Sequence, residues 1–165
     1  MAALIRFENL FTYTADATDV RLPLSALPSG TNHVHGRLEI IISGKPIPAL
    51  GYAGTDDVCL NTWTCEISAV VEALNQSSDA TYSFDEGEQG QPAYLFVREH
   101  DVLYVSVVDS PLSGAHGDPS YQQVSCAWED FRQAARQYIQ SLRAEIEREV
   151  PGYASTWLQR FASAA

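Results

Sequence analysis

The sequence predicts an α+β fold in which a largely antiparallel β-sheet packs against a long C-terminal helix. Short segments of apolar and polar alternation occupy the first third of the chain and return in its middle. One segment of helical period separates them, and a longer one covers residues 127–150. A chain of 165 residues is large enough for one core, so we expect a single domain over residues 1–165.

Three strands are expected before the first helix, at residues 4–11, 20–24 and 33–43. Pro23 confines the second strand to a sheet edge or a strand end, because proline has no backbone N–H to donate. Residues 46–58 are rich in proline, glycine and aspartate, which predicts a loop.

The mid-chain helix is expected over about residues 61–74, with Asn61 or Thr62 as its N-cap. Its apolar side chains form one stripe: Trp63, Ile67, Val70, Val71 and Leu74. A meander follows, with strands at residues 81–85, 93–98 and 102–108. Glu99-His100-Asp101 makes the tight turn between its last two strands, and residues 110–119 form a loop.

The long C-terminal helix, from Ala127 to Val150, is predicted by apolar residues at steps of three and four. They are Trp128, Phe131, Ala135, Tyr138, Ile139, Leu142 and Ile146, and we expect all of them except Ala135 to pack against the meander. Pro151 and Gly152 end this helix, and a short helix is expected over residues 153–162.

Acidic residues are concentrated in one part of the chain. Residues 46–131 contain fourteen acidic residues and one basic residue, Arg98, while the whole chain has a net charge of −11. Such a surface attracts basic partners and repels nucleic acid. The sequence also lacks the aromatic residues interleaved with basic residues that nucleic-acid binding would need. The charge therefore predicts protein binding rather than catalysis.

The sequence also bears on location. No run of eighteen apolar residues is present, so no membrane span is expected. The start, MAALIRFENLF, lacks the apolar core of a signal peptide, which favours the cytoplasm. The three cysteines show no CxxC spacing, so neither a disulfide framework nor a zinc site is predicted.

His33 and His35 are candidate metal ligands, because they share one face of a strand and lie about 7 Å apart along the chain. Two histidines can ligate a metal, but a third ligand is needed. Asp56, Asp57 and His116 are available in loops, yet nothing in the sequence places them nearby. We therefore expect a structural or solvent-facing pair, with no metal and no cofactor.

Catalysis is likewise not expected. Cys59 precedes a helix start, where the helix dipole lowers a thiol pKa, but no pattern of a cysteine hydrolase surrounds it. Asp85, Glu86 and Glu88 lie in a glycine-rich loop tip that favours solvation over acid–base chemistry or calcium binding. No phosphate-binding loop, dinucleotide fingerprint or serine elbow is present in the sequence.

Three segments within residues 60–150 carry a resemblance: LNTWTCEISAVVEAL, YSFDEGEQGQPAYLFVREHDVLYVSVVD and CAWEDFRQAARQYIQSLRAEIEREVP. In this arrangement the chain resembles the immunity proteins of bacterial polymorphic-toxin systems, which are small, acidic, cofactor-free α+β proteins. The resemblance implies a protein that binds and neutralises a cognate toxin and is not an enzyme. It implies no catalytic residues.

The partner expected is a toxin with a basic active-site cleft, with a nuclease as the first expectation, because an acidic surface can fill a phosphate-binding cleft. The acids expected to bind it are those that lie in loops and turns: Asp56, Asp57, Asp85, Glu86, Glu88, Glu99, Asp101 and Asp118. Tyr52, Tyr94 and Tyr121 are either exposed binding hot spots or core residues. Two alternatives remain open: a small metal-dependent enzyme using His33 and His35, and a secretion adaptor or chaperone.

Overall fold

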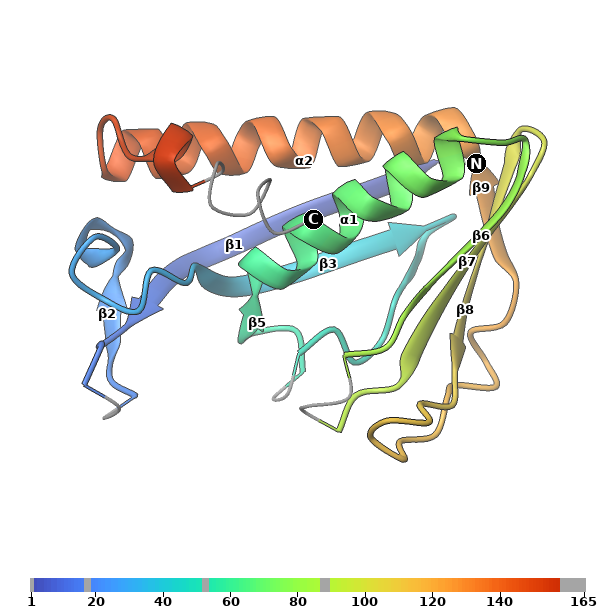
Figure 1. The fold of residues 1–165 in the computed structure, drawn as a ribbon, viewed down its shortest axis with the longest axis horizontal. Helices are drawn as coiled ribbons and strands as arrows, with labels where there is room; N and C mark the ends of the chain where they lie inside the picture. Colours follow the sequence, from blue (N-terminus) through green and yellow to red (C-terminus); the bar gives the residue numbers. More distant parts are fainter. Residues whose placement is uncertain (1, 17–18, 52–53, 87–89, 158–165) are drawn as a thin grey trace.

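Two antiparallel sheets and two long helices form the fold of residues 2–16, 19–51, 54–86 and 90–157, which are the residues that this computed structural model describes (Figure 1). The expected α+β class is confirmed, with the strands divided between two sheets. The first sheet consists of β1 (Ala3–Tyr13), β2 (Arg21–Pro23), β3 (His35–Ile42), β4 (Lys45–Pro46) and β5 (Val58–Cys59). The second consists of β6 (Asp79–Phe84), β7 (Ala93–Glu99), β8 (Val102–Val108) and β9 (Val124–Ala127).

The first sheet has the order β2-β1-β3-β4, and β5 also pairs with β3. As predicted, Pro23 lies in an edge strand, where its missing N–H leaves no gap in the ladder. The prediction of an unbroken loop over residues 46–58 is wrong at both ends, because β4 and β5 pair with β3 there. Each of these strands has only two residues, so neither produces a readable alternation.

The second sheet has its strands in chain order, and its turn at His100 and Asp101 is the predicted tight hairpin. His100 has a φ of 56°, the left-handed conformation that such turns require. The fourth strand, β9, was not predicted. Its sequence, VSCA, contains one strong strand former, Val124, in only four residues, and pairing with β8 makes it a strand.

The mid-chain helix, α1 (Leu60–Asn75), begins one or two residues before the predicted N-cap, so neither Asn61 nor Thr62 caps it. The N-cap residue is Cys59, which ends β5. Asn61 is only 4% exposed, and its side-chain oxygen accepts a hydrogen bond from the Val34 N–H at 2.8 Å. A tertiary contact therefore uses the side chain that the sequence pattern assigned to capping.

The long helix, α2 (Trp128–Glu149), runs along β1, and α1 packs against α2 and both sheets (Figure 1). Only the first turns of α2 meet the meander, where the Phe131 and Phe96 rings lie 6.2 Å apart. Further along, Tyr138 packs edge-on to Phe7 of β1 and shares a buried 2.9 Å hydrogen bond with Thr64 of α1. The prediction that the apolar stripe packs against the meander is therefore wrong for most of the helix, because α2 packs mainly against β1 and also contacts α1. Of the short helix predicted over residues 153–162, residues 154–157 are helical, Tyr153 lies in the turn before them, and residues 158–162 lie outside the described residues.

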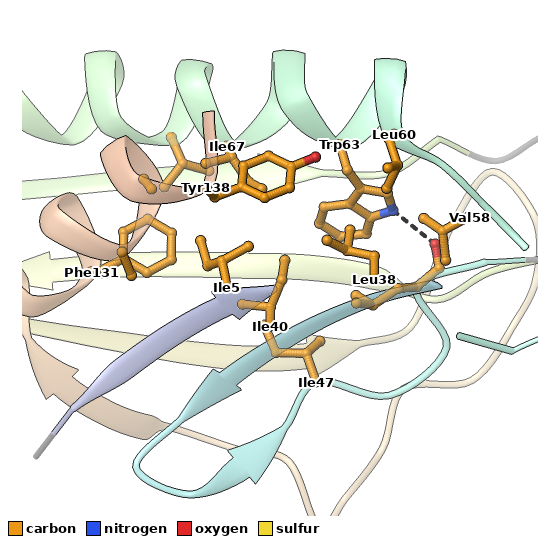
Figure 2. Packing of buried hydrophobic residues seen from close by; sticks show 14 of the residues in the cluster. Ile5, Leu38, Ile40, Ile47, Val58, Leu60, Trp63, Ile67, Phe131 and Tyr138 are labelled. Atoms are coloured by element: carbon orange, nitrogen blue, oxygen red, sulfur yellow. Dashed lines mark hydrogen bonds between the residues drawn. The ribbon is translucent and has the colours of Figure 1, made fainter. Parts of the chain in front are cut away.

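The core lies between the helices and the sheets (Figure 2). Trp63 is 2% exposed, and its indole N–H donates a 2.7 Å hydrogen bond to the Leu50 carbonyl. This bond fixes the loop before β5 to α1. Among the described residues, no helix is long and apolar enough to cross a membrane.

Replacing Leu142 with alanine tests the packing of α2. Leu142 is 1% exposed, so the variant loses buried contacts and leaves a cavity. We expect the free energy of unfolding to fall by about 2–5 kcal/mol in urea denaturation. Gln137→Ala, on the exposed face of the same helix, should change it by less than about 0.5 kcal/mol. Equal stability of the two variants would contradict the packing.

Candidate functional site

The candidate site forms where β5 pairs with the start of β3. His35 and Cys59 are direct partners in this antiparallel pair, so their backbones lie side by side. The Leu60 N–H then donates a 2.8 Å hydrogen bond to the Val34 carbonyl, and α1 begins at that point. The pairing therefore places Cys59 both opposite a histidine and at the N-terminus of a helix.

His33 reaches the same place from the segment before β3. The hydrogen bond from the Val34 N–H to Asn61 ties this segment to the first turn of α1. A ring nitrogen of His33, a ring nitrogen of His35 and the Cys59 sulfur all lie within 4.8 Å of one another. The sequence indicates no third ligand beside the two histidines, but the structure supplies one, Cys59. Cys59 was missed because only strand pairing brings it there.

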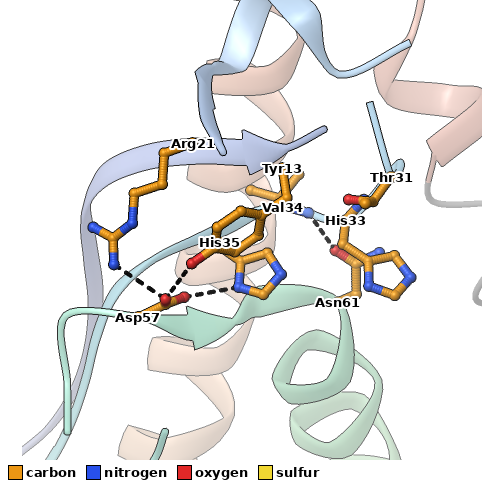
Figure 3. Close-up of polar contacts among 8 residues, drawn as sticks. All are labelled: Tyr13, Arg21, Thr31, His33, Val34, His35, Asp57 and Asn61. Atoms are coloured by element: carbon orange, nitrogen blue, oxygen red, sulfur yellow. Dashed lines mark hydrogen bonds and ion pairs between the residues drawn. The ribbon is translucent and has the colours of Figure 1, made fainter. Parts of the chain in front are cut away.

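Asp57 lies beside His35, and its carboxylate contacts three donor side chains (Figure 3). Its carboxylate accepts hydrogen bonds from the Tyr13 hydroxyl at 2.5 Å and from His35 Nδ1 at 2.9 Å, and the Arg21 guanidinium lies 3.1 Å away. Because an ionised carboxylate only accepts, Nδ1 of His35 carries the proton and Nε2 keeps a lone pair. Figure 3 shows Asp57 on one side of the His35 ring and His33 on the other.

The Asp57 network determines the charge states of its members. Burial raises the pKa of the Asp57 carboxyl, but hydrogen bonds with Tyr13 and His35 and the charge of Arg21 outweigh it, and the pKa lies below its usual value. Burial lowers the pKa of His35 below its usual value, and Asp57 offsets this only in part. Near neutral pH the pair is therefore an ionised Asp57 beside a neutral imidazole.

The thiol of Cys59 is also polarised. Burial raises its pKa, but hydrogen bonds with His33 and with Thr62 outweigh this effect, so the pKa lies below its ordinary value. The hydrogen bond with Cys59 raises the pKa of His33 in return. Thiolate and imidazole are both metal ligands, and together they also resemble a nucleophile and its base.

Aromatic rings enclose the site on the β1 side. Phe11 stacks on His35 with ring centroids 5.7 Å apart, Tyr13 meets His35 edge-on at 4.9 Å, and Arg21 lies over the Phe11 ring at 4.3 Å. A bulge in β1 between Glu8 and Phe11 produces this register. Gly36 permits the bulge, since a Cβ there would lie 2.9 Å from the Glu8 carbonyl oxygen.

The acids predicted to bind a partner do not gather in one place. Asp57 is half-buried in the network above, while Asp56 beside it is exposed and lies 3.5 Å from Arg37. Asp85 and Asp118 accept hydrogen bonds within the loops at one end of the second sheet, from Ser110 and Ser120. Glu86 is half-buried near Asp85, and Glu88 lies outside the described residues.

Glu99 and Asp101 are exposed at the opposite end of the second sheet, roughly 17 Å of strand from Asp85. Asp79 is the register partner of Glu99, and the Trp128 N–H donates a hydrogen bond to the Asp101 carbonyl, which brings Glu129 close. We call the exposed set of Asp79, Glu99, Asp101 and Glu129 the hairpin end. Figure 1 shows this turn beside the start of α2.

The other sequence candidates lie elsewhere. Tyr94 is 1% exposed and Tyr121 is fully buried, so both are core residues rather than surface hot spots. Tyr52 lies outside the described residues. His116 is exposed and 3.7 Å from Asp109, and it does not join the histidine pair.

No family model, curated protein or solved structure matches this chain. The functional interpretation therefore rests on the chemistry of the chain itself. Two features stand out, the His33–His35–Cys59 cluster on the first sheet and the exposed acids of the hairpin end on the second. Tyr13 and Arg21, which hold Asp57, had no sequence signal, because both come from the segment around the turn between β1 and β2.

Replacing Asp57 with alanine tests the network. The change leaves the Tyr13 hydroxyl and the His35 N–H without their acceptor, so we expect the free energy of unfolding to fall by about 1–3 kcal/mol. Asp56→Ala is the matched control, because the side chain of Asp56 is 75% exposed. It should change stability by less than about 0.5 kcal/mol. A similar small effect for both variants would mean that the network adds no stability.

Proposed function

We propose that this chain is a cytoplasmic immunity protein that binds and neutralises a cognate bacterial toxin, and that it is not itself the enzyme of the pair. The observation that carries the proposal is the charge of residues 46–131, where fourteen acidic residues face one basic residue. The resemblance of residues 60–150 to immunity proteins of polymorphic-toxin systems supports the same role.

The binding surface we propose is the hairpin end. Its four acids are exposed, with side-chain exposures of 63% for Asp79 and 65% for Glu129. Asp79 lies 3.3 Å from His100 and Glu129 lies 2.9 Å from Arg132, but all four side chains are exposed. Asp85 and Asp118, at the other end of the sheet, are half-buried and accept hydrogen bonds within their own loops. Because the hairpin-end side chains are exposed, they can approach a basic cleft while the chain stays folded.

The partner we propose is a toxin with a basic active-site cleft, of which a nuclease is the first candidate, because nucleases bind phosphate with lysine and arginine. Complementary charge speeds association by steering the two proteins together. A secretion adaptor or chaperone would also hold a toxin, but it would leave the active site open. Rescue of cells that express the toxin separates the two roles.

The charge prediction uses two triple variants that change the net charge equally. One reverses Glu99, Asp101 and Glu129 of the hairpin end to lysine. The other reverses Glu8, Asp19 and Asp56, which are exposed elsewhere. With a cognate toxin as the partner, we expect only the hairpin-end variant to associate more slowly, by at least about tenfold at low salt. Added salt should slow the wild type and leave that variant nearly unchanged.

Both variants must keep the circular dichroism spectrum and melting temperature of the wild type. Equal slowing in the two variants would show that net charge matters and the hairpin end does not. Full protection and an unchanged association rate in the hairpin-end variant would refute this binding surface. Failure of the wild type to protect cells from the toxin would refute the immunity function itself.

A further inference from the structure

The cluster of His33, His35 and Cys59 has the composition of a transition-metal site. Two imidazole nitrogens and a thiolate sulfur are the donors that zinc binds in proteins. They come from the segment before β3, from β3 itself and from the end of β5, and their ligand atoms all lie within 4.8 Å of one another. Among the described residues, no other group of three histidine, cysteine or acidic side chains converges in this way.

We propose that these three residues bind one zinc ion, whose fourth coordination position is open to solvent. This inference is independent of the proposed immunity function, because the hairpin end lies on the other sheet.

The geometry needs only a small adjustment. Zinc–nitrogen and zinc–sulfur bond lengths put two nitrogens and one sulfur of a tetrahedral site about 3.3–3.6 Å apart. His35 and Cys59 are held by strand pairing, so their positions are fixed by the backbone. His33 is exposed, and its ring can turn toward the other two ligands without disturbing the core.

The surroundings of His35 match those of a metal-bound histidine. Such histidines usually donate their second ring N–H to a carboxylate, which orients the ring and makes the ligating nitrogen more basic. Asp57 accepts this bond from Nδ1 at 2.9 Å, which leaves Nε2 for the metal. Tyr13 and Arg21 hold Asp57 in turn, so the carboxylate is positioned before any ion arrives.

The surroundings of Cys59 favour a thiolate. Cys59 is the N-cap residue of α1, where the helix dipole stabilises negative charge. A reactive thiol with His33 as its base would use the same pair. In that alternative His35 and Asp57 take no part in the chemistry. In a metal site His33, His35 and Cys59 bind the ion, and Asp57 orients His35.

The test is a titration of the full chain with Co²⁺, after treatment with a chelator and a phosphine reductant. We expect one Co²⁺ per chain, a thiolate-to-cobalt charge-transfer band in the near ultraviolet, and loss of the band when Zn²⁺ is added. Cys59→Ser should abolish the band, and His35→Ala should weaken binding strongly. Asp57→Asn should weaken it by about 10–100-fold, the usual effect of losing the carboxylate behind a ligand.

Cys65→Ser and His116→Ala are the matched controls, because both residues lie outside the cluster. Each should bind Co²⁺ as the wild type does. Absence of the charge-transfer band in the wild type, or its survival in Cys59→Ser, would overturn the proposal.

A second measurement does not depend on the folding of any variant. Iodoacetamide labelling of wild-type Cys59, followed by peptide mass spectrometry, should slow markedly when Zn²⁺ is present. An unchanged labelling rate would also overturn the metal site, and fast labelling in that case would point to a reactive thiol instead.

Discussion

The pairing of β5 with the start of β3 is the interaction on which both the packing of α1 and the candidate site depend. Two residue pairs, His35 with Cys59 and Gly36 with Val58, form it. The Leu60 N–H continues it by bonding to the Val34 carbonyl, and the helix starts there. Because α1 carries Trp63 into the core, this short stretch of backbone pairing positions one of the core's large side chains.

The same pairing explains why polar chemistry is gathered at this corner of the molecule. A strand that ends in a helix N-terminus places its last residue where backbone N–H groups lack partners inside the helix. Cys59 occupies that position, and the strand opposite presents His35. Asp57 lies two residues before Cys59, just ahead of β5, and accepts a hydrogen bond from the other side of the His35 ring. The β3–β5 pairing therefore sets both where α1 begins and which polar side chains meet there.

The acidic charge of the chain has more than one role in the fold. Asp57 orients His35 of the cluster, and Asp85 and Asp118 stabilise loops through hydrogen bonds with Ser110 and Ser120. Only part of the acidic set stands exposed, at the hairpin end and at scattered positions such as Asp56. A count of charges along the chain therefore overstates the charge that a partner meets at any one surface.

The sequence by itself determined the α+β class, the two long helices and the central strands, because these depend on local periodicity and on apolar stripes. The same local signals placed the tight turn at His100 and the edge position of Pro23.

Local signals could not find β4, β5 or β9, which have two to four residues each and exist through pairing with a neighbour. They also did not indicate that the strands form two sheets or that α2 packs against β1. Only the tertiary structure brought Cys59 to the two histidines and Asp57 behind His35, because ligand geometry follows from contacts between distant segments, and periodicity carries no information about those contacts.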